Sequence, residues 1–153
     1  MSDPDDLKTV NFPQSLAPLV SQVRMAILSG VDQEFLHDEE VAALGVTAAQ
    51  FTIIANVVKG RAHSACELCN FMDYDRGAMS RMIDRLESKG LVRRVPLPQN
   101  RRSMALEVTD AGKAAFPKMQ ACLDKVMNRL LKGVAKTQVR EAERTLRKIL
   151  ANS

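Results

Sequence analysis

The stretch from residue 64 to residue 112 constrains the fold most, because two short capped helices are followed at once by a strand–loop–strand pattern. Ser64 has the spacing of a capping box, and Asp73 or Asp75 can cap a second helix that ends at Gly90. One side of this second helix is apolar, with Ala78, Met79, Met82, Ile83 and Leu86. A short helix, a tight turn and a second helix with a free polar face indicate a helix-turn-helix.

A β-hairpin is predicted directly after these helices. Residues 91–95 and 104–108 are the two candidate strands, and the second run alternates apolar and small or charged residues as a half-buried strand does. The connection, residues 96–103, contains two prolines and a polar tip, which excludes a helix there. The hairpin is therefore predicted to be a wing that carries Arg101 and Arg102 at its tip.

Amphipathic helices are predicted on both sides of this unit. Residues 16–44 have helical spacing that Gly30 interrupts, and a long helix should follow residue 112 up to about Lys132. Gly133 should end that helix, and Thr137 can cap the last one. The flanking helices carry apolar faces that the central unit cannot cover alone, so a second copy of the chain is the simplest partner.

The distribution of charge is more informative than the net charge of +4 of the 153-residue chain. Eight cations lie between Arg76 and Arg102, opposed only by Asp84 and Glu87. A charged run alone usually marks a solvated surface, but this asymmetry also suits a polyanion. The acidic N-terminus lacks the pattern of a signal peptide, and no apolar run is long enough to span a membrane, so we expect a cytoplasmic protein.

Four segments together resemble the MarR family of bacterial winged helix-turn-helix regulators: residues 46–51, 76–94, 100–102 and 108–112. The resemblance implies a mainly α fold with a small β-hairpin, in which a winged helix-turn-helix core is flanked by N- and C-terminal dimerisation helices. We divide the chain into 1–45, 46–112 and 113–153 accordingly. One departure is Asn100, which stands where the family usually has a wing aspartate that braces an arginine, here Arg102.

Double-stranded DNA is the expected partner, read by a homodimer on a pseudo-palindromic operator. The predicted major-groove residues are Arg76, Gly77, Ser80 and Arg81, because the N-terminal half of the helix should enter the groove first. The predicted phosphate contacts are Arg85, Lys89, Arg93 and Arg94. Arg101 and Arg102 suit a narrow minor groove. The alternative for Arg85 is an ion pair with an acid on a neighbouring helix.

The resemblance also implies that a small molecule, often aromatic and anionic, relieves repression. Candidate anchors for its carboxylate are Arg24, Arg61, His37 and His63. We expect no cofactor and no metal. In the series His63, Cys66 and Cys69, three-residue steps on a helix leave the first and third side chains about 120° apart, and no fourth ligand has zinc-like spacing.

Two other functions remain open at this point. Cys66, alone or with Cys122, could make the chain a thiol-based redox-sensing regulator, although only His63 is placed to assist a thiolate. A winged helix can also serve as a protein- or RNA-interaction module. The sequence has no phosphate-binding glycine loop, nucleophile elbow or zinc-protease motif, so we do not expect an enzyme.

Overall fold

The computed structural model describes residues 16–153, except for the side chain of Arg101. It is mostly helical with one two-stranded antiparallel sheet, which confirms the predicted fold class. The elements are α1 (Leu16–His37), α2 (Glu39–Leu44), α3 (Ala48–Val58), α4 (Ala65–Met72), α5 (Arg76–Ser88), β1 (Val92–Leu97), β2 (Asn100–Val108), α6 (Asp110–Leu130) and α7 (Lys136–Leu150).

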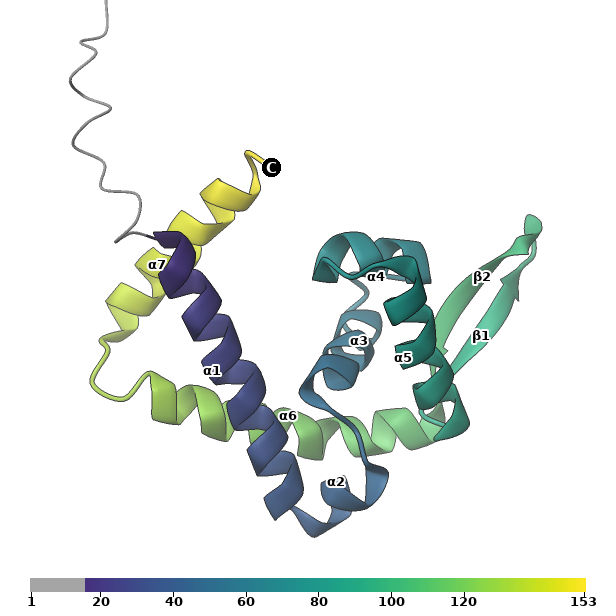
Figure 1. Ribbon diagram of the computed structural model, residues 1–153, viewed down its shortest axis with the longest axis horizontal. Coiled ribbons are helices and arrows are strands. Elements are labelled where there is room, and N and C mark those ends of the chain that lie inside the picture. Colours follow the sequence, from purple (N-terminus) through teal and green to yellow (C-terminus); the bar gives the residue numbers. More distant parts are fainter. Residues whose placement is uncertain (1–15) are drawn as a thin grey trace, which may run out of the picture.

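Helix α6 connects the two ends of the molecule (Figure 1). Helices α3, α4 and α5 and the β1–β2 hairpin lie towards its N-terminal end, and α1 crosses it further along. Helix α7 lies beside the N-terminal part of α1, away from the hairpin. The two flanking helices α1 and α6 pack on each other, and the helix-turn-helix is joined to them through the contacts of α3 with both.

The core forms where α3, α5 and α6 turn their apolar sides towards one another. Ile53 and Ile54 of α3 and Met119 of α6 are fully buried, as are Met79, Ile83 and Leu86 of α5. A complete capping box of Thr47 and Gln50 begins α3, as the sequence predicts. The buried α3 fixes the position of the two helices that follow it.

The prediction that Gly30 interrupts the first helix is wrong, because α1 runs through it to His37. A Cβ atom at Gly30 would lie 2.8 Å from Cγ1 of Val126, so the glycine allows α6 to approach α1 closely. The chain instead breaks after His37, where Asp38 caps α2 by accepting hydrogen bonds from the Glu40 and Val41 amides. A packing glycine and a helix-breaking glycine look alike in a sequence.

The hairpin is longer than predicted and its turn is shorter. Strand β1 continues through Pro96, and β2 already begins at Asn100 and includes the arginine pair, so only Pro98 and Gln99 lie between the strands. The expected cap of the last helix is also wrong: α7 begins after Ala135, whose amide donates to Oε1 of Gln138, and Thr137 lies inside the helix.

None of the helices in residues 16–153 is both long and apolar enough to cross a membrane.

Candidate nucleic-acid interface

Helix α5 is held at its N-terminus by Asp75, whose Oδ1 accepts a 2.8 Å hydrogen bond from the Ala78 amide. The apolar stripe of α5 is buried against the core, so the opposite face points away from the protein. All four predicted major-groove residues lie on this exposed part of the helix: Arg76, Gly77, Ser80 and Arg81. We call these four residues the reading face.

Helix α4 sets the direction in which α5 leaves the core. Its N-cap is Ser64, which accepts from the Glu67 amide, and Leu68 is fully buried. Helix α4 ends at Asp73, whose φ of 55° is left-handed, and the Tyr74 amide then donates to the Cys69 carbonyl. This sharp turn brings α5 back across α4, as a helix-turn-helix requires.

The hairpin, which we call the wing, is fixed at its base. The register pairs Val92 with Val108 and Pro96 with Met104. Thr109 follows β2, and its Oγ1 donates a hydrogen bond to the Gly90 carbonyl at 2.5 Å. The Thr109 amide donates to the Leu91 carbonyl. These bonds attach the base of the wing to the end of α5.

The tip of the wing contains an irregularity that the sequence did not predict. Pro96 pairs with Met104 but Leu97 pairs with Asn100, so residues 101–103 have no partner in β1. Oδ1 of Asn100 accepts from the backbone amide of Arg102 at 3.1 Å. The asparagine thus braces the backbone of this bulge, and the Arg102 side chain is exposed. The side chain of Arg101 lies outside the described residues.

The four predicted phosphate contacts have different surroundings. Arg85 is exposed and has no ion pair with any acid within residues 16–153, so the alternative of a pairing acid does not hold there. Lys89 donates from Nζ to the Gly45 carbonyl. Arg93 pairs with Glu107 across the strands at 2.7 Å and keeps 65% of its side chain exposed. These three side chains remain at the surface.

Arg94 differs from the other three because it is the least exposed, at 24% of its side chain. Its Nη2 lies 2.7 Å from Oδ1 of Asp84, and its Nη1 contacts Oε2 of Glu87. Burial lowers the pKa of Arg94, but the hydrogen bonds to the two carboxylates outweigh burial and raise it. The kind of ion pair that was the alternative for Arg85 is therefore made by Arg94, and its acids lie on α5.

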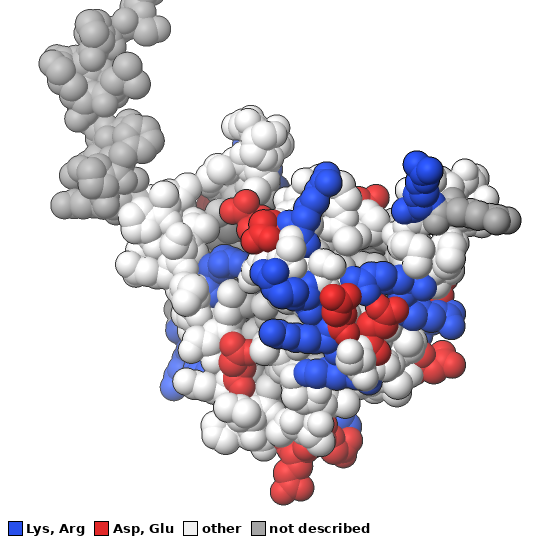
Figure 2. Space-filling view, turned by 45° about the vertical axis from the view of Figure 1, so that its right-hand side comes forward, with Lys and Arg blue, Asp and Glu red and all other residues white. Residues whose placement is uncertain are grey.

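Basic side chains gather on the side of the molecule that carries α5 and the wing (Figure 2). A few acidic groups lie among them. The acids among the charged residues of α5 and β2 include Asp84, Glu87 and Glu107, each paired with an arginine of β1. Each pair neutralises an arginine of β1 together with its acid, so the positive charge of this face comes mainly from cations with no ion pair within the described residues, such as Arg76, Arg81 and Arg85.

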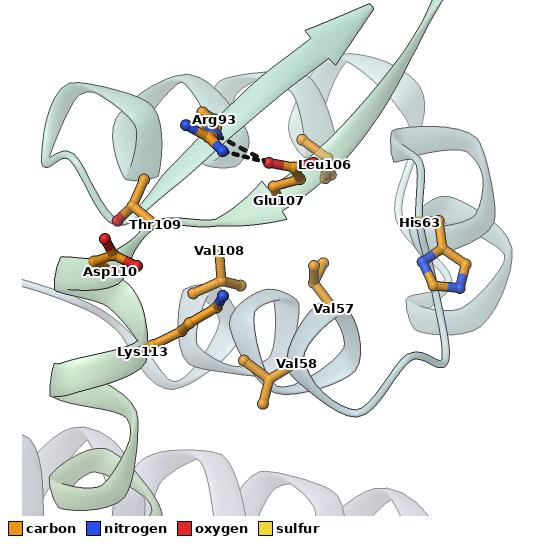
Figure 3. Close-up of a pocket in the computed structure, with 10 residues that line it drawn as sticks. All are labelled: Val57, Val58, His63, Arg93, Leu106, Glu107, Val108, Thr109, Asp110 and Lys113. Atoms are coloured by element: carbon orange, nitrogen blue, oxygen red, sulfur yellow. Dashed lines mark hydrogen bonds and ion pairs between the residues drawn. The ribbon is translucent and has the colours of Figure 1, made fainter. Parts of the chain in front are cut away.

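The residues proposed as ligand anchors do not come together. Arg24 lines a hollow of about 200 Å³ with Phe71 and Tyr74, between α1, α3 and α4. His63 lines a different hollow of about 690 Å³ at the base of the wing, where Lys113 points towards the same space (Figure 3). Arg61 and His37 are exposed and line neither hollow. The sequence analysis did not identify Lys113 as a residue of this hollow. Nothing in the sequence around Lys113 marks it, and only the position of α6 brings it there.

The cysteines are also separated by their surroundings. Cys66 is exposed, Cys69 is partly buried against the core as expected, and Cys122 is buried in α6. Burial raises the pKa of the Cys122 thiol, which disfavours a reactive thiolate there. In the part of the chain that the structure describes, no group of three potential metal-ligating side chains comes together.

Comparison with known proteins agrees with this geometry. The sequence model of the MarR family matches residues 46–104. The chain is 30% identical over 116 residues to the multiple antibiotic resistance protein MarR of Escherichia coli (strain K12), covering 75% of this chain and 81% of that protein. It is 28% identical to the HTH-type transcriptional repressor MdtR of Bacillus subtilis (strain 168), covering 84% of both chains.

Among solved structures, the C80S mutant of E. coli MarR complexed with operator DNA superimposes with a TM-score of 0.73 and 27% identity. The match covers 97% of this chain and 99% of that one, so it includes the flanking helices as well as the winged unit. Sequence and structure therefore agree over nearly the whole length, and the chain belongs to the MarR family of transcription regulators.

Proposed function

We propose that this protein is a homodimeric repressor that recognises a pseudo-palindromic operator in duplex DNA through the reading face and the wing. The observation that carries the proposal is that all four residues of the reading face are exposed beside a wing whose Arg102 is exposed as well. The relatives support it: MdtR is a transcriptional repressor, and the E. coli MarR mutant was solved on operator DNA. The members of this family are DNA-binding regulators rather than enzymes.

The reading face has the chemistry of sequence readout. Arg76 and Arg81 each present a guanidinium that can donate two parallel hydrogen bonds to a guanine, and Ser80 can bond a base or a phosphate. At Gly77 a Cβ atom would lie 3.2 Å from the end of the flexible Arg81 side chain and 3.2 Å from Oδ1 of the capping Asp75, with no backbone of another element near it. The missing side chain at Gly77 therefore serves close approach to DNA more than packing within the protein.

The remaining cations would hold the helix in register. Arg85, Lys89 and Arg93 flank the reading face and suit phosphates, which set position without reading sequence. At the wing tip, Arg101 and Arg102 suit a narrow A·T-rich minor groove. Two separate surfaces would then contact one half-site, which raises both affinity and specificity over either surface alone.

A second copy of the chain is the partner proposed for α1 and α7. Exposed apolar side chains of both helices line a groove of about 510 Å³, among them Leu19, Val20, Val23 and Leu146. Surfaces of this kind mark protein interfaces. Two reading faces related by a two-fold axis would match the two halves of a pseudo-palindrome.

We assign relief of repression to a small aromatic anion in the hollow that Arg24 lines. Arg24 supplies a cation, and Phe71 and Tyr74 supply aromatic surface in the same hollow. The hollow lies between α1 and the helices α3 and α4. An occupant would therefore bias the position of the helix-turn-helix relative to α1. Since the target is chromosomal DNA, we place the protein in the cytoplasm.

Arg81→Ala and Arg102→Ala test the proposed surfaces. Operator fragments selected from genomic DNA would be titrated with each variant by fluorescence anisotropy, and each variant should bind at least about tenfold more weakly, since each loses a groove contact. Lys125→Ala, which removes one exposed positive charge from α6, is the control. Unchanged affinity in both arginine variants would refute the assignment. RNA and single-stranded probes at matched salt distinguish the interaction-module alternative.

A further inference from the structure

The ion pairs of Arg94 connect the wing to α5, the helix that carries the reading face and that we also call the reading helix, at the point where the wing leaves the protein. Arg94 is the third residue of β1, and both of its partners, Asp84 and Glu87, lie one helical turn apart on α5. Glu87 also accepts a hydrogen bond from the Arg94 backbone amide at 3.4 Å. Backbone and side chain of the same strand residue are thus fastened to one carboxylate.

Arg93 and Arg94 are neighbours in sequence but belong to opposite faces of the wing, because successive side chains of a strand alternate. Arg93 points to the outer face, where it pairs with Glu107 within the hairpin. Such a pair stiffens the wing but cannot orient it. Arg94 alone of the two joins the wing to another element.

The geometry points to Arg94 as a positioning residue for DNA recognition: by clamping β1 to Asp84 and Glu87 of α5, it sets the angle between wing and reading helix so that both reach their grooves together. This inference rests on the proposed function, and it replaces the phosphate contact expected of Arg94. Nη1 and Nη2 of Arg94, the donors that would bind a phosphate, already bind the carboxylates of Glu87 and Asp84.

The length of the wing makes this angle matter. The tip lies at least three residues beyond Arg94, which at about 3.3 Å per residue is roughly 10–15 Å. A rotation of about 15° at the clamp would move the tip by about 3 Å, the length of a hydrogen bond. Without the clamp, Arg102 would leave the groove while the reading face stays bound.

A double-mutant cycle between Arg94→Ala and Arg102→Ala tests the clamp, because the two residues would be coupled only through the orientation of the wing. Each single variant should bind operator about tenfold more weakly, and the double variant should be no weaker than Arg94→Ala. Arg85→Ala with Arg102→Ala is the matched control, and there the two losses should multiply. If the losses multiply for Arg94 as well, the clamp is refuted.

Salt dependence gives a second, independent readout. Both variants are compared in an Arg101→Ala/Arg102→Ala background, so that loss of the wing contacts does not itself change the salt dependence. Arg85→Ala should then lower the slope of log affinity against log salt by about one unit because it loses a phosphate, whereas Arg94→Ala should leave the slope nearly unchanged. A slope that falls by about one unit when Arg94→Ala is added to this background would identify Arg94 as a phosphate contact and refute the clamp. Arg94→Lys, which keeps the charge but reaches only one carboxylate well, should recover part of the affinity.

A variant that leaves Arg94 intact guards against an effect of misfolding. The double variant Asp84→Ala/Glu87→Ala removes two negative charges from the DNA-binding side, and the introduced alanines favour the helical conformation of α5. A clamp predicts weaker operator binding in this variant, whereas simple electrostatics predicts stronger binding, which would overturn the inference. If Arg81→Ala and Arg102→Ala have no effect on the same operator, the proposed function itself fails, so the two failures are distinguishable.

Discussion

At the scale of single residues, two glycines of the DNA-binding part differ in what a side chain would meet. A Cβ atom at Gly112 would lie 2.2 Å from the Leu91 carbonyl oxygen and 2.6 Å from Cγ1 of Val108. The backbone of Leu91 cannot yield, because its amide and carbonyl are both hydrogen-bonded. At Gly77 the nearest groups are side-chain ends, Nη1 of Arg81 and Oδ1 of the capping Asp75, both at 3.2 Å. One glycine therefore serves packing and the other leaves room outside the protein.

Alanine at these two positions should separate stability from DNA binding. Gly112→Ala should lower the free energy of unfolding by about 1–3 kcal/mol, since α6 must move away from the base of the wing. Gly77→Ala should change it by less than about 1 kcal/mol, because the helix propensity of alanine offsets the small shift that Arg81 and Asp75 must make, but it should weaken operator binding. Urea titration and anisotropy measure the two effects. Equal stabilities of the two variants would contradict this account.

At the scale of elements, Thr109 joins three parts of the domain. Its Oγ1 accepts from the Gly112 amide at 3.1 Å, which caps α6, and donates to the Gly90 carbonyl after α5. The same residue directly follows β2. Thr137 offers the same side chain near the start of α7, but it is not the cap there.

Thr109→Val and Thr137→Val form a matched pair that tests this assignment. Thr109→Val keeps the shape but loses both hydrogen bonds, so the free energy of unfolding should fall by about 1–2 kcal/mol. Thr137→Val should change it by less than about 0.5 kcal/mol, as an exposed substitution does. Thermal melts followed by circular dichroism give both values. A larger loss in Thr137→Val would mean that α7 is capped as the sequence alone suggests.

At the scale of the whole molecule, α7 is the element least supported by its own chain. All of its residues are exposed or partly exposed, and Ile149 and Leu150 are 42% and 69% exposed. The apolar side of α7 faces the exposed N-terminal half of α1 across a shared groove. Helices with an uncovered apolar side gain their stability from a partner rather than from propensity.

Leu19→Glu should dissociate the proposed dimer, because it places a charge in the apolar groove between α1 and α7. Sedimentation velocity should give a monomer at concentrations where the unmodified protein is a dimer, and operator affinity should fall with the loss of the second half-site. Leu36→Glu, on the same helix but outside this groove and 76% exposed, is the control and should remain dimeric. A dimeric Leu19→Glu variant would exclude this groove as the interface.

Local sequence patterns were enough to predict the helices of the helix-turn-helix unit. The capping residues Thr47, Ser64 and Asp75 lie where the sequence indicated helix starts, and the apolar stripe of α5 is buried. Such features depend on hydrogen bonds and spacing within a few residues, which a sequence displays directly. The predicted reading face follows from them, since it is the side of α5 opposite the stripe.

Contacts between distant segments were decided only by the tertiary structure. A glycine is visible at position 30 in the sequence, but only the structure shows that α1 continues through it and that Val126 of α6 packs against it. The eight cations were alike in sequence, yet Arg94 is turned inward to Asp84 and Glu87 while Arg85 stays free within the described residues. By itself, the sequence determined a basic winged helix-turn-helix. The packing of β1 against α5 decided which arginines face solvent and which hold the wing, because the strength of an ion pair depends on distance in space and not on separation along the chain.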